Sequence, residues 1–128
     1  MSATRTRLAV AATALAIASS VMAAGTAHAS DDVVRRGACS GSAHWKIKAK
    51  PDDGRVEVET EIDSNRVGQS WTWVLRHNGN VAARGSSLTK APSGSFSVER
   101  RTANAPGADH FAFRGTHAGQ VCLAKVSL

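Results

Sequence analysis

The chain has 128 residues, and its 16 Lys and Arg residues outnumber its 10 Asp and Glu residues, which gives a formal net charge of +6. This length predicts one domain with a modest hydrophobic core and excludes a chain of several domains. The mild positive surplus allows weak attraction to an anionic polymer, but it does not require nucleic acid or any other specific partner.

Residues 1–29 have the three parts of a secretory signal peptide in the required order. Two arginines form a basic start, a charge-free stretch follows, and small residues lie at Ala27 and Ala29 before the expected cleavage site. The charge-free stretch, residues 8–24, is rich in alanine and shorter than the roughly 20 strongly apolar residues of a membrane span, so we expect no span. The expected product is a secreted, extracellular monomer that begins at Ser30 and carries a net charge of +4.

Residues 30–42 are polar and rich in Gly and Ser, which predicts a flexible lead-in. The folded domain is therefore expected to span residues 43–128. Along this span, apolar and polar residues alternate with a period of two, which is typical of half-buried β-strands, and helical periodicity is weak.

Cys39 and Cys122 are the only cysteines in the chain. In an oxidising compartment an even pair indicates a disulfide. A metal pair or a redox dithiol favours a C-x-x-C spacing, which this chain lacks. Closing so long a loop would stabilise the domain by about 4–5 kcal/mol in the chain-entropy model.

The clearest pair of strands covers residues 45–50 and 55–62, on either side of a Pro-Asp-Asp-Gly turn sequence. A hairpin with a four-residue loop pairs Lys50 with Arg55. In that register Lys48 faces Glu57. The apolar residues of both strands then share one face of the hairpin, and opposite charges lie across from each other on the other face.

The remaining strands follow the same alternation. Trp71 and Trp73 lie in phase with Leu75, which predicts core tryptophans; the alternative is a sugar-binding platform of exposed rings together with Trp45. The dipeptide Asn78-Gly79 predicts a second hairpin. The other strands are expected around residues 81–85, 96–101, 111–113 and 121–128. Seven strands with turn sequences between them predict an all-β, antiparallel, immunoglobulin-like sandwich, in which both cysteines fall at the same end.

No catalytic, cofactor or metal site is predicted. The chain has no G-x-S-x-G sequence, and the histidines at 44, 77, 110 and 117 are scattered along it. The candidates for contact with a partner are polar residues in loops and at strand ends: Asn65, Arg66, His77, Asn78, Arg100 and Arg101.

Several short sequences carry a resemblance to a known group of proteins: Asp63-Ser64-Asn65-Arg66, Gly68-Gln69-x-Trp71, Leu75-x-His77-Asn78-Gly79 and Ala91-Pro92-Ser93-Gly94-Ser95-Phe96. In these the chain resembles a family of small secreted actinomycete proteins that carries no assigned activity. The resemblance implies export and adds nothing on mechanism. The expected function is a secreted, non-catalytic binding module whose partner the sequence does not identify; an anionic polymer and a glycan are the candidates. The alternatives are an inhibitor or small-ligand carrier and, third, a small hydrolase.

Overall fold

The computed structural model describes residues 31–128, so the predicted signal peptide, residues 1–29, lies outside the described residues. The described part consists of antiparallel β-strands and contains no helix. Eight strands occur along it: β1 (Val33–Ala38), β2 (His44–Asp52), β3 (Arg55–Asp63), β4 (Ser70–His77), β5 (Asn80–Leu88), β6 (Ser95–Ala103), β7 (His110–His117) and β8 (Gln120–Ser127). No helix long and apolar enough to cross a bilayer is found among these residues.

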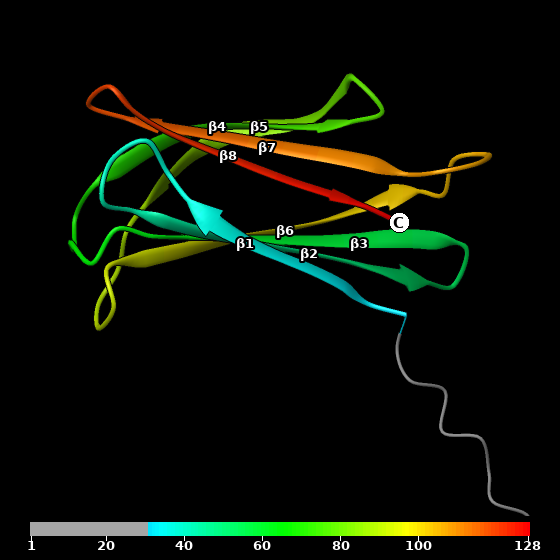
Figure 1. Cartoon of the computed structure of the whole chain (residues 1–128), viewed down its shortest axis with the longest axis horizontal. Coiled ribbons are helices and arrows are strands. Elements are labelled where there is room, and N and C mark those ends of the chain that lie inside the picture. The colour runs from blue at the N-terminus through cyan, green and yellow to red at the C-terminus, as the bar shows by residue number, and fades with distance from the viewer. Residues whose placement is uncertain (1–30) are drawn as a thin grey trace, which may run out of the picture.

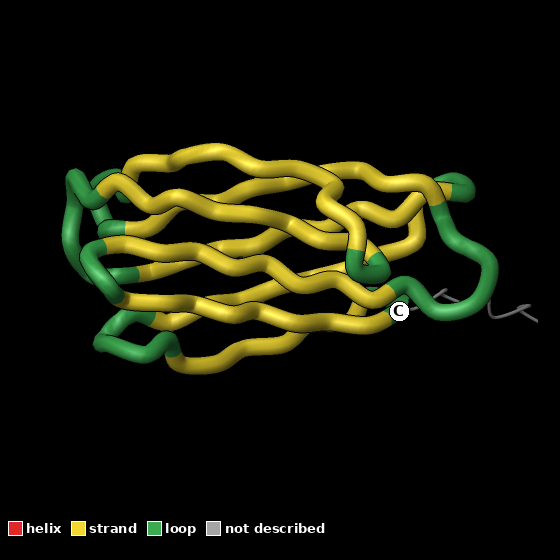
Figure 2. The backbone as a smooth tube through the Cα atoms, turned by 90° about the horizontal axis from the view of Figure 1, so that it is seen from above, coloured by secondary structure: helices red, strands yellow, loops and turns green. Residues whose placement is uncertain are grey.

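The strands form two four-stranded sheets that pack face to face (Figure 1). Sheet A has the order β1-β2-β3-β6, and sheet B has the order β5-β4-β7-β8. The strands run along the molecule, and the connections gather at its two ends (Figure 2). We call these ends the disulfide end, which holds the β1–β2 connection, and the C-terminal end, which holds the β6–β7 loop. The predicted all-β, antiparallel fold of two sheets is confirmed.

The core lies between the sheets and follows the predicted alternation. Every second residue of the central strands is buried, among them Ile47, Val58, Trp71 and Phe113. Trp73 is 4% exposed, and its indole occupies the space beside Gly85, the residue paired with it in β5. A Cβ atom added to Gly85 would lie 2.9 Å from the Trp73 ring. The two tryptophans of β4 are therefore core residues, and they form no exposed platform.

The prediction of seven strands is wrong by one. Residues Val33–Ala38, inside the segment expected to be a flexible lead-in, form β1 and pair with β2 along its length. The sequence of β1 does not alternate, because an edge strand needs only one row of backbone hydrogen bonds and buries little side-chain surface. Gly37 is half-buried and leaves room for the ring of Trp45 on the neighbouring strand.

The predicted hairpin exists, but its register is wrong by two residues. Lys50 pairs with Glu57, and Asp52 pairs with Arg55. The loop has two residues, Asp53 and Gly54, with φ angles of 47° and 76°. Positive φ at both positions matches the tight turn whose twist suits a hairpin. Because the shift is even, the apolar and charged sides of both strands stay as predicted.

The predicted disulfide between Cys39 and Cys122 is confirmed, with a Cα–Cα distance of 4.3 Å. It joins the β1–β2 connection to β8, and so joins the two sheets. Hydrogen bonds support the same junction: the amide of Ser40 donates to the carbonyl of Val121 (2.8 Å), and the amide of Ala43 donates to the Gln120 side chain (2.8 Å).

Candidate binding face

Charge is distributed unequally between the outer faces of the two sheets. Residues 31–128 contain fourteen basic and ten acidic side chains. On the outer face of sheet A the two signs balance, because each lysine of β2 pairs across the strand with a glutamate of β3. Arg101 of β6 adds ion pairs to Asp52 (3.1 Å) and Glu57 (3.7 Å). The face holds six basic residues, Arg36, Lys46, Lys48, Lys50, Arg55 and Arg101, and six acidic ones, Asp52, Glu57, Glu59, Glu61, Asp63 and Glu99.

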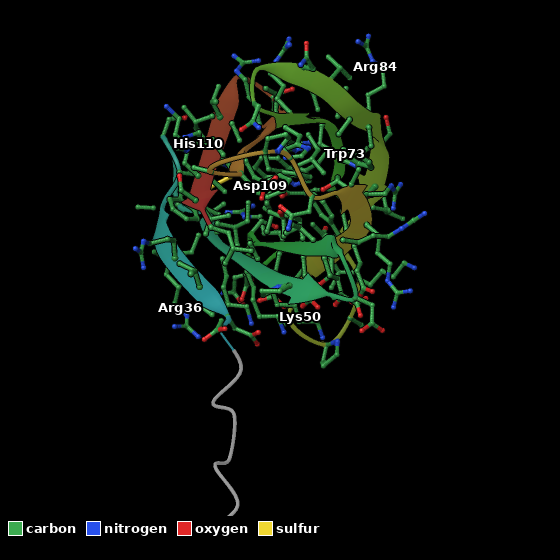
Figure 3. The ribbon with its side chains drawn as sticks, turned by 90° about the vertical axis from the view of Figure 1, so that its right-hand side faces the viewer. Arg36, Lys50, Trp73, Arg84, Asp109 and His110 are labelled. Carbon is green, nitrogen blue, oxygen red and sulfur yellow. A yellow bond between two sulfur atoms is a disulfide. The ribbon has the colours of Figure 1, made fainter. Side chains whose placement is uncertain are left out.

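The outer face of sheet B carries positive charge alone. None of its four strands contains an Asp or a Glu, and each contributes one exposed cation: Arg84 from β5, Arg76 from β4, Arg114 from β7 and Lys125 from β8. Figure 3 looks at the C-terminal end and shows Arg84 on the opposite side of the sandwich from Lys50 of sheet A. The remaining charged residues, outside these two faces, are equal in number for each sign. The net charge of the described chain therefore lies on this one face.

The register fixes how these four cations are arranged. Arg84 and Arg114 occupy the two positions that flank Val74, and Arg76 lies two residues further along β4. We call residues that pair side by side across the strands a row. Lys125 lies in the same row as Arg76, with Ala112 between them. Neighbouring strands are about 4.8 Å apart, and two residues along a strand span about 7 Å. The cations thus form a zigzag across the sheet, with one charge per strand.

The row that contains Ala112 is hollowed. A depression of about 280 Å³ is lined there by Arg76, Lys125, His110 and Ala112, with Phe111 and Val126 beneath. Nδ1 of His110 lies 2.7 Å from the Ser127 hydroxyl, which holds the imidazole at the edge of the depression. The face also exposes apolar side chains, Leu123 (45%) and Val81 (40%) among them. Its cations therefore stand among hydroxyl and aliphatic groups.

The contact residues predicted from the sequence lie in three separate places. Asn65 and Arg66 are at the disulfide end, where the Asn65 amide donates to the Asp63 carboxylate (2.9 Å). The Arg66 carbonyl accepts a hydrogen bond from the Thr89 hydroxyl. These contacts hold the β3–β4 loop against the β5–β6 loop.

His77 and Asn78 lie at the C-terminal end and serve mainly to hold that end together. The Asn78 side chain accepts a hydrogen bond from the amide of His110 (2.8 Å) and donates to the carbonyl of Ala108 (3.3 Å). Nε2 of His77 donates to Asp109 at 2.7 Å, since a carboxylate only accepts, and the ring stacks on Phe111 with centroids 4.5 Å apart.

Arg100 and Arg101 also contact their own chain. The Arg100 guanidinium lies over the ring of Trp73, 5.4 Å from its centroid, and donates to the carbonyl of Glu99. Arg101 belongs to the balanced face of sheet A. None of the four cations of sheet B was predicted as a contact residue. The sequence does contain a sign of this face, because the four strands that form it lack Asp and Glu. That sign appears only when the charged residues are grouped by strand.

The structure also shows where the residues that a serine hydrolase or a metal site would need are placed. A serine hydrolase needs a histidine that contacts both a serine and a carboxylate. Among the hydrogen bonds of residues 31–128, Ser127 contacts His110, whereas Asp109 contacts His77. No group of three or more potential metal ligands is found in the same part of the chain.

The buried pair of His77 and Asp109 supports a test of stability. Their side chains are 16% and 4% exposed, and Asp109 has one further donor, the amide of Ala105 (3.0 Å). We expect His77→Phe to keep the stacking on Phe111 but to lower the free energy of unfolding by about 1–3 kcal/mol, because the carboxylate loses a donor. Urea unfolding of His77→Phe, Asp109→Asn and the double variant measures the coupling. Additive effects of the two substitutions would show that the hydrogen bond stabilises nothing.

Comparison of the chain with known protein families, with curated proteins and with solved structures finds no match. The function proposed below therefore rests on the geometry and charge of the described residues. The outer face of sheet B is the feature that departs most from a balanced, solvated surface, because all four of its charged groups have one sign.

Proposed function

We propose that this protein is a secreted, non-catalytic module that binds an anionic polysaccharide through the outer face of sheet B. The observation that carries the proposal is the zigzag of Arg84, Arg76, Arg114 and Lys125, one cation per strand, in four strands without a carboxylate. Like charges held on a rigid sheet repel one another, and an anionic partner removes that repulsion on binding. Sheet A supplies the comparison within the same molecule, since its charges already neutralise one another.

The side chains around the cations favour a polysaccharide over a nucleic acid. Proteins that bind single strands without sequence preference stack bases on aromatic rings. The aromatic residues of sheet B, Trp71, Trp73, Phe111 and Phe113, are all buried in the core. Duplex binding rests on many phosphate contacts, about six to ten in a typical complex, and this face offers four cations. Hydroxyl groups from Thr72, Ser86 and Thr116 lie on the same face and suit the hydroxyl groups of sugars.

The connectivity supports an immunoglobulin-like sandwich as part of the proposal. The β4–β5 hairpin belongs to sheet B, after which β6 returns to sheet A beside β3, and β7 lies beside β4. Such crossings between the sheets are typical of the Greek-key arrangement of immunoglobulin-like domains. Export through the predicted signal peptide belongs to the same proposal, and so does the kinship with small secreted actinomycete proteins. A disulfide is consistent with an oxidising, extracellular location.

Removing two cations from the face is expected to weaken binding of polygalacturonate, a linear polymer with one carboxylate per sugar. We expect Arg84→Ser/Arg114→Ser to raise the Kd about tenfold at low salt, because each lost contact weakens binding by up to about 1 kcal/mol. The matched control is Lys46→Ser/Lys48→Ser, which removes the same charge from the balanced face of sheet A. Isothermal titration calorimetry at two salt concentrations gives both values, and salt should weaken the wild-type complex.

Other anionic partners are tested in the same series. Single-stranded DNA and vesicles of anionic lipid are titrated beside the polysaccharide. Tight binding of either one without binding of polygalacturonate or of dextran sulfate would contradict the proposal. Equal loss of affinity in the two double variants would also contradict it, because the effect would then follow net charge and not the face of sheet B.

A further inference from the structure

The hollow between Arg76 and Lys125 differs from the rest of the cationic face. In the row of Arg84 and Arg114 the intervening residue is Val74, whereas in the row of Arg76 and Lys125 it is Ala112. The short side chain of Ala112 leaves the depression of about 280 Å³ open between two cations. A group bound there would be enclosed by charge on both sides, which the other row does not allow.

The polar groups around the hollow have donors left over for a ligand, and two of them, Arg76 and His110, form hydrogen bonds within the chain. One nitrogen of the Arg76 guanidinium donates to the carbonyl of Gly79 (3.3 Å), which fixes that side chain and leaves most of its five N–H groups for a ligand. Neither Arg76 nor Lys125 takes part in an ion pair within residues 31–128. Nδ1 of His110 is engaged by Ser127, so Nε2 is the ring nitrogen left for a ligand.

We infer that this hollow is a subsite for one anionic group, a carboxylate or a sulfate, of the polysaccharide; the inference rests on the proposed function and specifies its site. Arg76 supplies the planar, bidentate donor that matches such a group, and Lys125 supplies the opposing charge. His110, which lies at the C-terminal end of the sandwich (Figure 3), also lines the hollow.

The arrangement of the other cations indicates the direction of the polymer. The four charges advance by one strand spacing each, about 4.8 Å, which is close to the length of one sugar residue in an extended chain. They also alternate between two rows. A ribbon-like polysaccharide that crosses the strands at right angles, with charges on alternate sides of successive sugars, would therefore meet one cation at each residue. Lys125 and Arg76 lie in one row of this path and Arg114 and Arg84 in the other.

Filling the hollow without changing its charge tests the subsite. Ala112→Leu places a larger side chain between Arg76 and Lys125, and the position is half-buried on the outer face, so the sandwich is expected to fold. We expect the Kd for tetragalacturonate to rise about tenfold, and the melting temperature to stay unchanged. The matched control is Thr116→Leu, on the same strand and the same face, in a row without a cation; its Kd should stay within about twofold of the wild type.

The outcomes separate the subsite from the proposed function. If the wild type binds the polymer and Ala112→Leu binds equally well, the subsite is wrong while the binding face stands. If Thr116→Leu weakens binding as much as Ala112→Leu, the effect belongs to the whole face and the subsite is again wrong. If the wild type binds neither tetragalacturonate nor a sulfated oligosaccharide of equal length, both inferences fail. Loss on Ala112→Leu for one of these two probes alone supports the subsite and identifies the anionic group that it accepts.

Discussion

Trp73→Ala is expected to lower the free energy of unfolding by about 3–5 kcal/mol, a large part of the roughly 5–15 kcal/mol that stabilises a typical domain. The ring of Trp73 stacks on Phe113, with centroids 5.4 Å apart, and its indole N–H donates to the Ser87 hydroxyl at 3.0 Å. The two residues paired with Trp73 are glycines, which have no side chain to fill the space that alanine leaves. The cavity therefore stays open, and the contacts of the indole are lost without replacement.

Thermal unfolding followed by tryptophan fluorescence measures this effect. For a domain of this size, the loss corresponds to a fall in melting temperature on the order of 10–40 °C. Thr72→Ala is the matched control, because Thr72 precedes Trp73 on the same strand and is exposed on the opposite face. Trp73→Phe, which keeps an aromatic ring, should fall between the two. A Trp73→Ala protein that melts at the wild-type temperature would show that the ring does not belong to the core.

The double variant Cys39→Ala/Cys122→Ala is expected to lose a similar amount, about 4–5 kcal/mol, because the two cysteines are 83 residues apart and the disulfide removes much of the conformational freedom of the unfolded chain. The hydrogen bonds of Ser40 and Ala43 to β8 stay available in the variant, so the native fold keeps the same junction.

Urea unfolding of the oxidised wild type, the reduced wild type and the double variant measures this contribution. The two proteins without the disulfide should have equal midpoints, well below that of the oxidised wild type. A double variant as stable as the oxidised wild type would show that the β1–β2 connection is already held by its hydrogen bonds. Titration of free thiols in the oxidised protein provides the control, since both cysteines are bonded to each other.

The strands that bury one face could be predicted from the sequence because burial imposes alternation on them. Trp71, Trp73 and Leu75 are in phase, and all three are buried. The strand β1 could not be predicted in this way, since it packs at an edge and buries little. The hairpin register depends on whether Pro51 and Asp52 belong to the loop or to the strand. The alternation of apolar and charged residues is the same in both cases and does not decide between them. Backbone pairing of Asp52 with Arg55 decides it.

The candidate site is harder to predict, because exposure of a polar residue in a loop does not reveal whether its side chain is free to contact a partner. His77, Asn78 and Arg101 are polar, yet their side chains bind other residues of the same chain. Each of the four strands of sheet B contributes one cation, and only the pairing of the strands brings the four cations together on one face. A net charge summed over the chain hides this arrangement, since the balanced face of sheet A contributes nothing to the total.

The position of the disulfide determines how the domain bears a mechanical load. Strand β1 begins and β8 ends at the C-terminal end of the sandwich, whereas Cys39 and Cys122 lie at the other end. A force that pulls on the segments before Cys39 and after Cys122 therefore separates β1 from β2 and β8 from β7 one residue pair at a time. The separation ends at the disulfide, which then bears the force. The residues between the cysteines carry no tension, and the released segments extend by at most about 50 Å. A stretched domain would keep Arg76, Arg84 and Arg114 in place, but it would withdraw Lys125 from the face.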